Sequence, residues 1–359
     1  MKIIFIILFA ICMFFAGKLF GQTTGSSIAV SGFVDTYYSK NFNHPSSRSN
    51  ALRNFDIAEN QFTLSLAEIV LQKKASPVGF RMDLDYGTAN DVVQPGNGST
   101  LSVLQQGYLT AILPIGEGLT VDVGKFTTHM GYEVIESKDN WNYSRSLLFA
   151  WAVPYYHTGI RLSYPVADNI TTTVHVVNGW NSVSDNNNWK SVGATVNFAL
   201  SSSSAVILNV LSGSEDLILS PTLYETGKKN VVDIIVTHQL TEVVAMGVNA
   251  DYGEARTNQG LELWKGAALY GRYTLDQTSA LAIRAEIFDD PKGYATGIGA
   301  LHLDVKEVTG TYEYRFAEEL VFRCEARCDF SNSPIFMKNT LINPERNQPT
   351  ALVGVVATF

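Results

Sequence analysis

The sequence contains few charged residues and has no long apolar run after its N-terminus. Lys, Arg, Asp and Glu make up 17% of 359 residues, with 34 acidic against 26 basic. An acidic balance argues against nucleic-acid binding, which needs basic side chains to neutralise phosphates. No later segment approaches the ~20 apolar residues of a transmembrane helix. The 28 Gly, 16 Tyr and 19 Phe favour a β protein over a helical one.

Catalytic and metal-binding motifs are also missing. The sequence has no G-x-S-x-G, no H-E-x-x-H, no C-x-x-C and no phosphate-binding glycine loop followed by Lys-Ser or Lys-Thr. Cys324 and Cys328 lie ~13 Å apart on a predicted strand, beyond the ~7 Å that a disulfide allows. The scattered histidines are predicted to be lumen, rim or loop residues: His44, His129, His157, His175, His238 and His302. We therefore expect no enzyme, no cofactor and no metal site.

The N-terminus has the features of a secretion signal. Lys2 gives a short positive start, and the following run to Ala16 is apolar and uncharged. Because this run is too short to span a bilayer, residues 1–21 are predicted to be a cleaved signal peptide, leaving 22–359. Cleavage removes two lysines, so the mature chain would hold 26 − 2 = 24 basic and 34 acidic residues, a net charge of −10.

Polar and apolar residues alternate with a period of two along the mature chain. The clearest segment is 320–330, where Phe322, Cys324 and Ala326 share an apolar face. Similar segments occur at 80–86, 192–200 and 281–287. A membrane-spanning β-strand of ~9–11 residues has this pattern, with lipid on one side and water on the other.

The spacing of these segments predicts an all-β, antiparallel, up-and-down transmembrane barrel of about sixteen strands, within a range of fourteen to eighteen. The predicted strands are 28–42, 57–75, 78–88, 104–114, 119–130, 156–167, 170–180, 190–200, 204–212, 229–240, 243–253, 264–275, 279–289, 296–316, 319–331 and 349–359. Short turns alternate with longer polar loops at 43–56, 89–103, 131–155, 181–189, 213–228, 254–263 and 332–348. This alternation is typical of a bacterial outer-membrane barrel, with short periplasmic turns, long extracellular loops and both termini in the periplasm.

Two places break the alternation. Leu303 and Val305 are out of phase with Val308, which a β-bulge near Lys306-Glu307 would reconcile and an extra hairpin would also explain. A similar slip falls around Glu68. The last strand alternates regularly and ends on Phe359, similar to the signal by which barrel-insertion machinery recognises outer-membrane barrels. We expect this machinery and outer-membrane lipid to be partners.

Several short motifs stand close together between Val123 and Trp180. They are Gly124-Lys125-Phe126, Gly131-Tyr132-Glu133, Asn140, Tyr143-Ser144-Arg145-Ser146, Pro154, Thr158-Gly159 and Asn178-Gly179-Trp180. Taken together, they resemble the β-barrel porin-2, or OmpL-like, family. The resemblance implies an outer-membrane barrel that acts as a porin, and it implies no catalytic residue and no particular solute.

The loop 131–155 is unusually rich in aromatic and aliphatic residues for a surface loop. Apolar surface of this extent requires burial, and folding into the barrel would narrow the pore. Packing on the barrel mouth, on a neighbouring protomer or against a cell-surface partner are the alternatives. If the loop folds inward, its charges nearest the constriction are Glu133, Glu136, Lys138, Asp139 and Arg145.

On this register, five cations and seven anions line the pore: Arg81, Asp83, Asp85, Asp122, Arg161, Asp233, Arg284, Glu286, Arg323, Glu325, Arg327 and Asp329. We predict a water-filled channel for passive diffusion of small hydrophilic solutes or ions, with a weak preference for cations. The main alternative is a surface adhesion or scaffold module that works through its long loops, and a barrel enzyme is the third. Porins of this size often form homo-oligomers, but the sequence identifies no interface.

Overall fold

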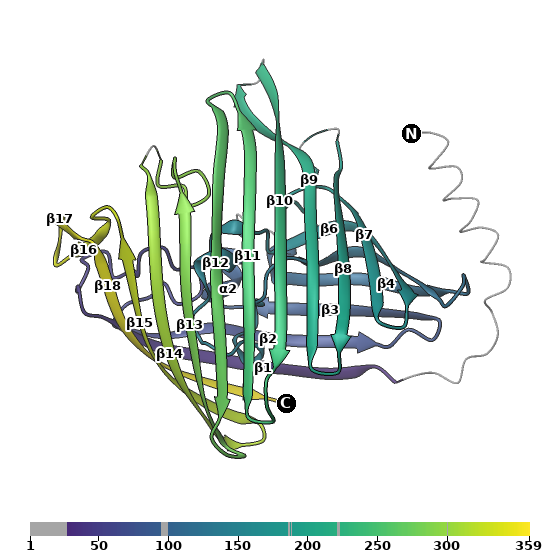
Figure 1. Cartoon of the computed structure of the whole chain (residues 1–359), viewed down its shortest axis with the longest axis horizontal. Coiled ribbons are helices and arrows are strands. Elements are labelled where there is room, and N and C mark those ends of the chain that lie inside the picture. The colour runs from purple at the N-terminus through teal and green to yellow at the C-terminus, as the bar shows by residue number, and fades with distance from the viewer. Residues whose placement is uncertain (1–26, 95–99, 186, 188, 221–222, 300) are drawn as a thin grey trace.

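The computed structural model describes residues 27–94, 100–185, 187, 189–220, 223–299 and 301–359. The predicted signal peptide, residues 1–21, lies outside the described residues. Within them, sixteen antiparallel strands form one closed barrel, which confirms the predicted fold class and strand number (Figure 1). In this part of the chain, no helix is long and apolar enough to cross a membrane.

Neighbours along the chain pair with each other around the barrel. The barrel strands are β1 (Ala29–Asn41), β2 (Phe62–Lys73), β3 (Val78–Tyr86), β4 (Leu104–Leu113), β5 (Leu119–Thr127), β6 (Tyr156–Ala167), β7 (Ile170–Val177), β8 (Ser191–Ser201), β9 (Ser204–Ser220), β10 (Leu223–Gln239), β11 (Val244–Thr257), β12 (Gly260–Thr274), β13 (Ser279–Asp290), β14 (Leu303–Ala317), β15 (Leu320–Ser331) and β18 (Asn347–Thr358). A separate hairpin, β16 (Phe336–Lys338) with β17 (Thr340–Glu345), lies between β15 and β18. Short helices interrupt two loops: α2 (Thr88–Val93), η1 (Thr100–Val103), η2 (Ser137–Asp139) and η3 (Leu148–Ala152).

The first and last strands close the barrel. β1 pairs with β18 from Phe33 opposite Thr358 to Asn41 opposite Thr350. Beyond that ladder, Gly32 and Phe359 exchange two backbone hydrogen bonds of 3.2 and 3.0 Å. A Cβ atom on Gly32 would come within 2.6 Å of the Phe359 ring, so glycine permits this close approach. The start of β1 and the end of β18 therefore meet at one rim of the barrel, the lower one in Figure 1.

The predicted alternation of inner and outer faces is confirmed along the strands. On β13, Ile283 and Ile287 are exposed, while Arg284 and Glu286 between them are buried inside the barrel. On β15, Cys324 is exposed on the outer side. An apolar outer wall and a polar inner wall suit a barrel that has lipid around it and water within it.

Two predicted long loops are wrong. The segment 213–228 continues as strand through Ser220 and resumes at Leu223, with Lys228 opposite Ser214. The segment 254–263 likewise stays paired up to Thr257 opposite Gly260. In Figure 1, β9 to β12 rise above the other strands. Beyond the lipid both faces of a strand can be polar, so the alternation fades while the backbone pairing continues.

The predicted bulge near Lys306-Glu307 is also wrong. β13 and β14 keep one unbroken register from Leu303 to Tyr314. Leu303 and Val305 point inward and are fully buried in an apolar cluster inside the barrel mouth. In the sequence analysis, apolar residues were assigned to the outer face, so inward-facing apolar side chains were read as a change in the alternation. The sequence does not show that other parts of the chain cover these side chains inside the barrel.

The second predicted irregularity exists. On β2, the register with β1 shifts between Leu64 and Leu66, leaving Ser65 unpaired with β1. Ser65, Leu66 and Glu68 are all buried, so the shift turns consecutive side chains toward the interior. The predicted slip around Glu68 is therefore confirmed, two to three residues earlier in the chain.

Candidate channel lumen

The connection between β5 and β6, residues 128–155, lies against inward-facing side chains of the barrel wall. We call it the lumen segment. Tyr143 near its middle is fully buried, and its hydroxyl donates a 2.6 Å hydrogen bond to Asp35 of β1. A Cβ atom on Gly354 of β18 would come within 2.5 Å of the Tyr143 ring. Glycine at this wall position therefore makes room for the tyrosine.

Two wall carboxylates bind the backbone of the lumen segment. Glu325 accepts hydrogen bonds from the amides of Tyr143 and Ser144, at 2.7 and 3.0 Å. Glu286 accepts bonds from the amides of Leu147 and Leu148, at 2.7 and 2.6 Å. A buried amide without a hydrogen-bond partner costs free energy. These two carboxylates therefore fix the lumen segment at two points, 143–144 and 147–148.

Arginines on β13 and β15 form the centre of a buried ion-pair network. Arg284 bonds Glu307 at 2.6 Å, Glu133 of the lumen segment at 2.7 Å and the Ser144 carbonyl at 2.6 Å. Arg327 lies 3.4 Å from Glu307 and donates to the Arg145 carbonyl at 2.6 Å. Each arginine thus ties the barrel wall to the lumen segment, and each charge has an opposite partner.

The network continues into a second inward segment, the connection 42–61 between β1 and β2. Arg53 bonds Asp56 at 2.5 Å and Asp329 of β15 at 2.8 Å. Phe55 packs against Phe149 and Tyr155, with ring centroids 5.8 and 5.7 Å apart. No pattern in the sequence indicated that this loop also folds inward.

Beside the lumen segment, the described residues enclose two cavities that are lined mainly by polar side chains. The larger, of about 230 Å³, is lined by Glu68, Arg81, Gln106, Tyr108, Thr127, Glu136, Lys138, Asp139 and Arg161. The other, of about 170 Å³, is lined by Lys138, Asp139, Asn140, Trp141, Arg272, Glu313, Arg315, Val321, Arg323, Val356 and Thr358. We call them the first and second lumen cavities. Lys138 and Asp139, 2.5 Å apart, belong to both linings, so the two cavities adjoin at this pair.

The twelve charged residues expected along the pore all lie on the inner wall, but they differ in exposure. Ten of them are buried: Asp83, Asp85, Asp122, Asp233, Arg284, Glu286, Arg323, Glu325, Arg327 and Asp329. Arg81 and Arg161 keep part of their side chains exposed in the first lumen cavity. Most of the charge that was expected to face water therefore holds inward-folded loops in place instead.

The five charged residues of the lumen segment also differ in whether they are buried or line the cavities. Glu133 and Arg145 are buried, and Arg145 donates to the carbonyls of Tyr143 and Ile135. Glu136 accepts a 2.6 Å hydrogen bond from Gln105 of β4, and burial raises the pKa of its carboxyl group. Lys138 and Asp139 face the lumen cavities. Of the five, Glu136, Lys138 and Asp139 line the lumen cavities, and Glu133 and Arg145 do not.

Several charged residues of the inner wall were missed by the sequence analysis, among them Glu307, Arg272, Glu313 and Arg315. Glu307 was missed because the supposed bulge removed it from the inner face. Arg272 and Glu313, which form a 2.7 Å ion pair, and Arg315 lie toward the short-turn ends of β12 and β14. Strict alternation from Arg284 and Arg323 through the paired strands would have identified all four.

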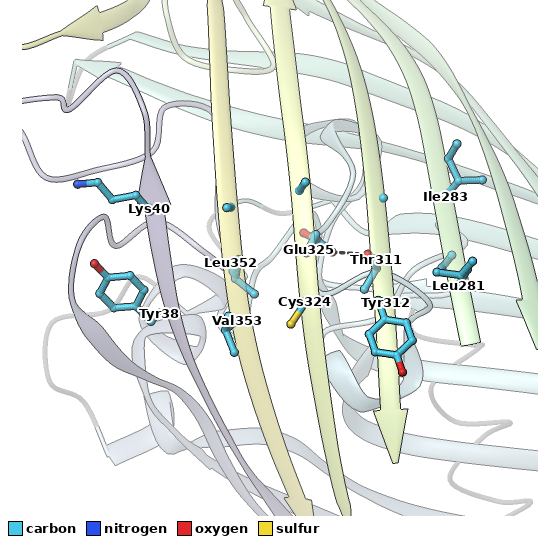
Figure 2. Close-up of a pocket in the computed structure, with 14 residues that line it drawn as sticks. Tyr38, Lys40, Leu281, Ile283, Thr311, Tyr312, Cys324, Glu325, Leu352 and Val353 are labelled. Carbon is cyan, nitrogen blue, oxygen red and sulfur yellow. Dashed lines mark hydrogen bonds between the residues drawn. The ribbon is translucent and has the colours of Figure 1, made fainter. Parts of the chain in front are cut away.

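A larger hollow, of about 700 Å³, lies on the outer wall over β13, β14, β15, β18 and β1. Figure 2 shows Tyr312, Cys324 and Val353 at this hollow, and a dashed hydrogen bond between Thr311 and Glu325. Its lining is almost entirely apolar, and small residues such as Gly310 and Ala326 leave the space open. This hollow lies on the lipid side of the wall and contributes nothing to the lumen. Among the described residues, no group of three His, Cys, Asp or Glu side chains is arranged to hold a metal ion.

Solved structures of outer-membrane proteins share this fold at low sequence identity. The anion-selective porin from Comamonas acidovorans is 9% identical, with a TM-score of 0.62 over 93% of this chain and 99% of its own. The outer-membrane channel DcaP of Acinetobacter baumannii is 13% identical, with a TM-score of 0.61 over 95% and 99%. OmpT of Vibrio cholerae in its trimer form is 10% identical, with a TM-score of 0.62 over 93% and 99%.

No curated protein sequence matches this chain. The family model described as "Putative beta-barrel porin-2, OmpL-like" matches residues 27–359, which is nearly the whole sequence. Membership of this family supports a location in the bacterial outer membrane and a channel function. The chain belongs to the β-barrel porin-2, OmpL-like, family of outer-membrane proteins.

Proposed function

We propose that the protein is a porin through which small hydrophilic solutes and ions diffuse passively. The observation that carries the proposal is the pair of adjoining polar cavities inside a closed sixteen-strand barrel. A barrel of ~16 strands is wide enough for an aqueous channel, whereas one of ~8 strands is filled by its own side chains. Polar cavities beside an inward-folded segment are what such a channel requires at its narrowest level.

The lumen segment sets the width of the proposed channel. Its apolar residues pack in one cluster with those of the connection 42–61 and with inward-facing residues of the wall, and its charged turn at Lys138 and Asp139 borders the cavities. Buried carboxylates and arginines of the wall bind the lumen segment and hold it in position. We therefore expect a narrow channel that selects by size as well as by charge.

The proposal includes the topology and assembly of the barrel. Residues 1–21 direct secretion, Phe359 in the closing strand is recognised by the insertion machinery, and both termini lie on the periplasmic side. Because OmpT of Vibrio cholerae has a trimer form, self-association of this chain is part of the proposal. Outer-membrane lipid surrounds the apolar wall.

Swelling of liposomes that contain the refolded protein tests the proposed diffusion. Liposomes transferred into an isotonic pentose solution are expected to swell rapidly, and those in an isotonic tetrasaccharide solution slowly, because the lumen segment limits solute size. Light scattering follows the swelling, with protein-free liposomes as the control. Folded barrels that admit neither sugar above the control rate would contradict the proposal.

One observation favours the alternative of a surface module. β9 and β10 have 17 residues each, well beyond the ~9–11 residues that a strand needs to cross a membrane. Their paired ends therefore project from the barrel as a long hairpin (Figure 1). The swelling measurement separates the two functions, because a surface module alone predicts no solute-dependent swelling.

A further inference from the structure

Three arginine–carboxylate pairs that border the lumen cavities share an asymmetry. In the pair of Arg81 with Asp83, the arginine side chain is 30% exposed and the carboxylate 0%. The corresponding values are 24% and 8% for Arg161 with Asp122. They are 22% and 9% for Arg272 with Glu313. In each of these three pairs the carboxylate is buried against the wall, and the guanidinium is the more exposed group.

The two arginines of the first lumen cavity are held in a fixed orientation. Arg81 and Arg161 each bond the carboxylate through Nε, at 2.9 and 2.7 Å. The Arg161 guanidinium also lies over the rings of Tyr108 and Phe126, at 5.0 and 4.7 Å. An arginine bound through Nε and stacked on aromatic rings keeps its terminal amino groups directed at whatever enters the cavity.

The remaining acidic groups around the cavities do not offset these cations. Glu68 is buried, and Glu136 is half-buried and accepts a 2.6 Å hydrogen bond from Gln105. Asp139 is the exposed carboxylate of the group, and Lys138 neutralises it at 2.5 Å. Arg315, exposed at the second lumen cavity, adds a further cation. Although the whole chain is acidic, the surface that a solute meets is therefore basic.

We propose that the channel prefers small oxyanions, carrying carboxylate or phosphate groups, and that Arg81, Arg161, Arg272 and Arg315 set this preference. The inference rests on the proposed porin function and names its class of solute. The planar guanidinium fork matches the two oxygens of a carboxylate or phosphate. Charge counted along the strands suggested a weak cation preference. Burial of the carboxylates reverses that expectation, because the local potential depends on the charges that line the passage.

The reversal potential across a planar bilayer with a KCl gradient tests the preference. At ~0.1 M salt, where the Debye length is ~10 Å, the wild-type channel is expected to pass Cl⁻ more readily than K⁺. The double variant Arg81→Gln/Arg161→Gln is expected to lower the Cl⁻/K⁺ permeability ratio by about two-fold or more. Arg315→Gln should lower it less, and this change leaves no buried carboxylate without its partner. Arg256→Gln, which removes an equal charge at an exposed position of β11, should leave the ratio unchanged.

Inorganic phosphate provides the second measurement, because it is itself an oxyanion. Added at constant ionic strength, phosphate is expected to reduce the Cl⁻ current of the wild-type channel more than that of the Arg81→Gln/Arg161→Gln variant. A conducting wild-type channel that prefers K⁺ would overturn the inference and leave the porin intact. Equal ratios in the wild type and in both lumen variants would also overturn it. Folded barrels that carry no current would instead refute the proposed function.

Discussion

Replacing Arg284 with alanine is expected to lower the free energy of unfolding by ~3–5 kcal/mol, the usual loss when one partner of a buried ion pair is removed. Arg284 is fully buried and binds Glu307, Glu133 and the Ser144 carbonyl. The variant would leave two carboxylates buried without this cation and would release the lumen segment from β13. Urea unfolding in detergent, followed by the gel mobility of unheated samples, measures the loss.

Two control variants test whether the loss of stability comes from the broken buried ion pairs. Arg256→Ala removes an arginine from an exposed position and should change stability by about 0.5 kcal/mol or less. The triple variant Arg284→Met/Glu133→Gln/Glu307→Gln removes the buried charges together and should recover most of the loss. If Arg284→Ala were as stable as Arg256→Ala, the network would not be what fixes the lumen segment.

Replacing residues 136–150 with a short Gly-Ser linker is expected to raise single-channel conductance several-fold. The deletion removes Tyr143, Leu148 and Phe149, three large side chains buried inside the barrel. Glu286 and Glu325 lose their backbone partners, but water then fills the space and hydrates them, so the barrel should still fold. Planar-bilayer recording of the variant measures the conductance, and faster migration of unheated samples checks the fold.

A deletion of similar kind outside the lumen is the matched control. Removing residues 337–344 shortens the β16–β17 hairpin, which lies outside the barrel sheet, and should leave conductance unchanged. A folded deletion of 136–150 with wild-type conductance would show that the lumen segment does not limit the channel.

The strands of the barrel wall could be predicted because the alternation of apolar and polar residues is visible within each strand. A strand with lipid on one side must alternate, so Arg323, Glu325 and Arg327 could be assigned to the inner face from the residues between them. The backbone pairing then fixed sixteen strands in chain order. Where both faces of a strand are wet, as at 213–228, the alternation no longer carried information and the strand ends were misplaced.

The arrangement inside the barrel could not be predicted, since it depends on contacts between distant parts of the chain. Arg284 and Glu133 are 151 positions apart, and Arg53 and Asp329 are 276 apart. No local pattern indicates whether a charge on the inner face meets water or another loop. Counting inner-face charges therefore overestimated the negative charge that solutes would meet. Exposure of individual side chains was needed to distinguish the cations at the cavities from the carboxylates behind them.

Single-channel recording of the wild-type protein in a planar bilayer tests whether this barrel holds a water-filled passage. Protein whose fold has been verified by its unheated gel mobility is added at ~1 M KCl, where the Debye length is ~3 Å and charge effects on current are weakest. Discrete, uniform current steps that persist at low voltage are expected. Verified barrels that insert into the bilayer and produce no current steps would contradict such a passage.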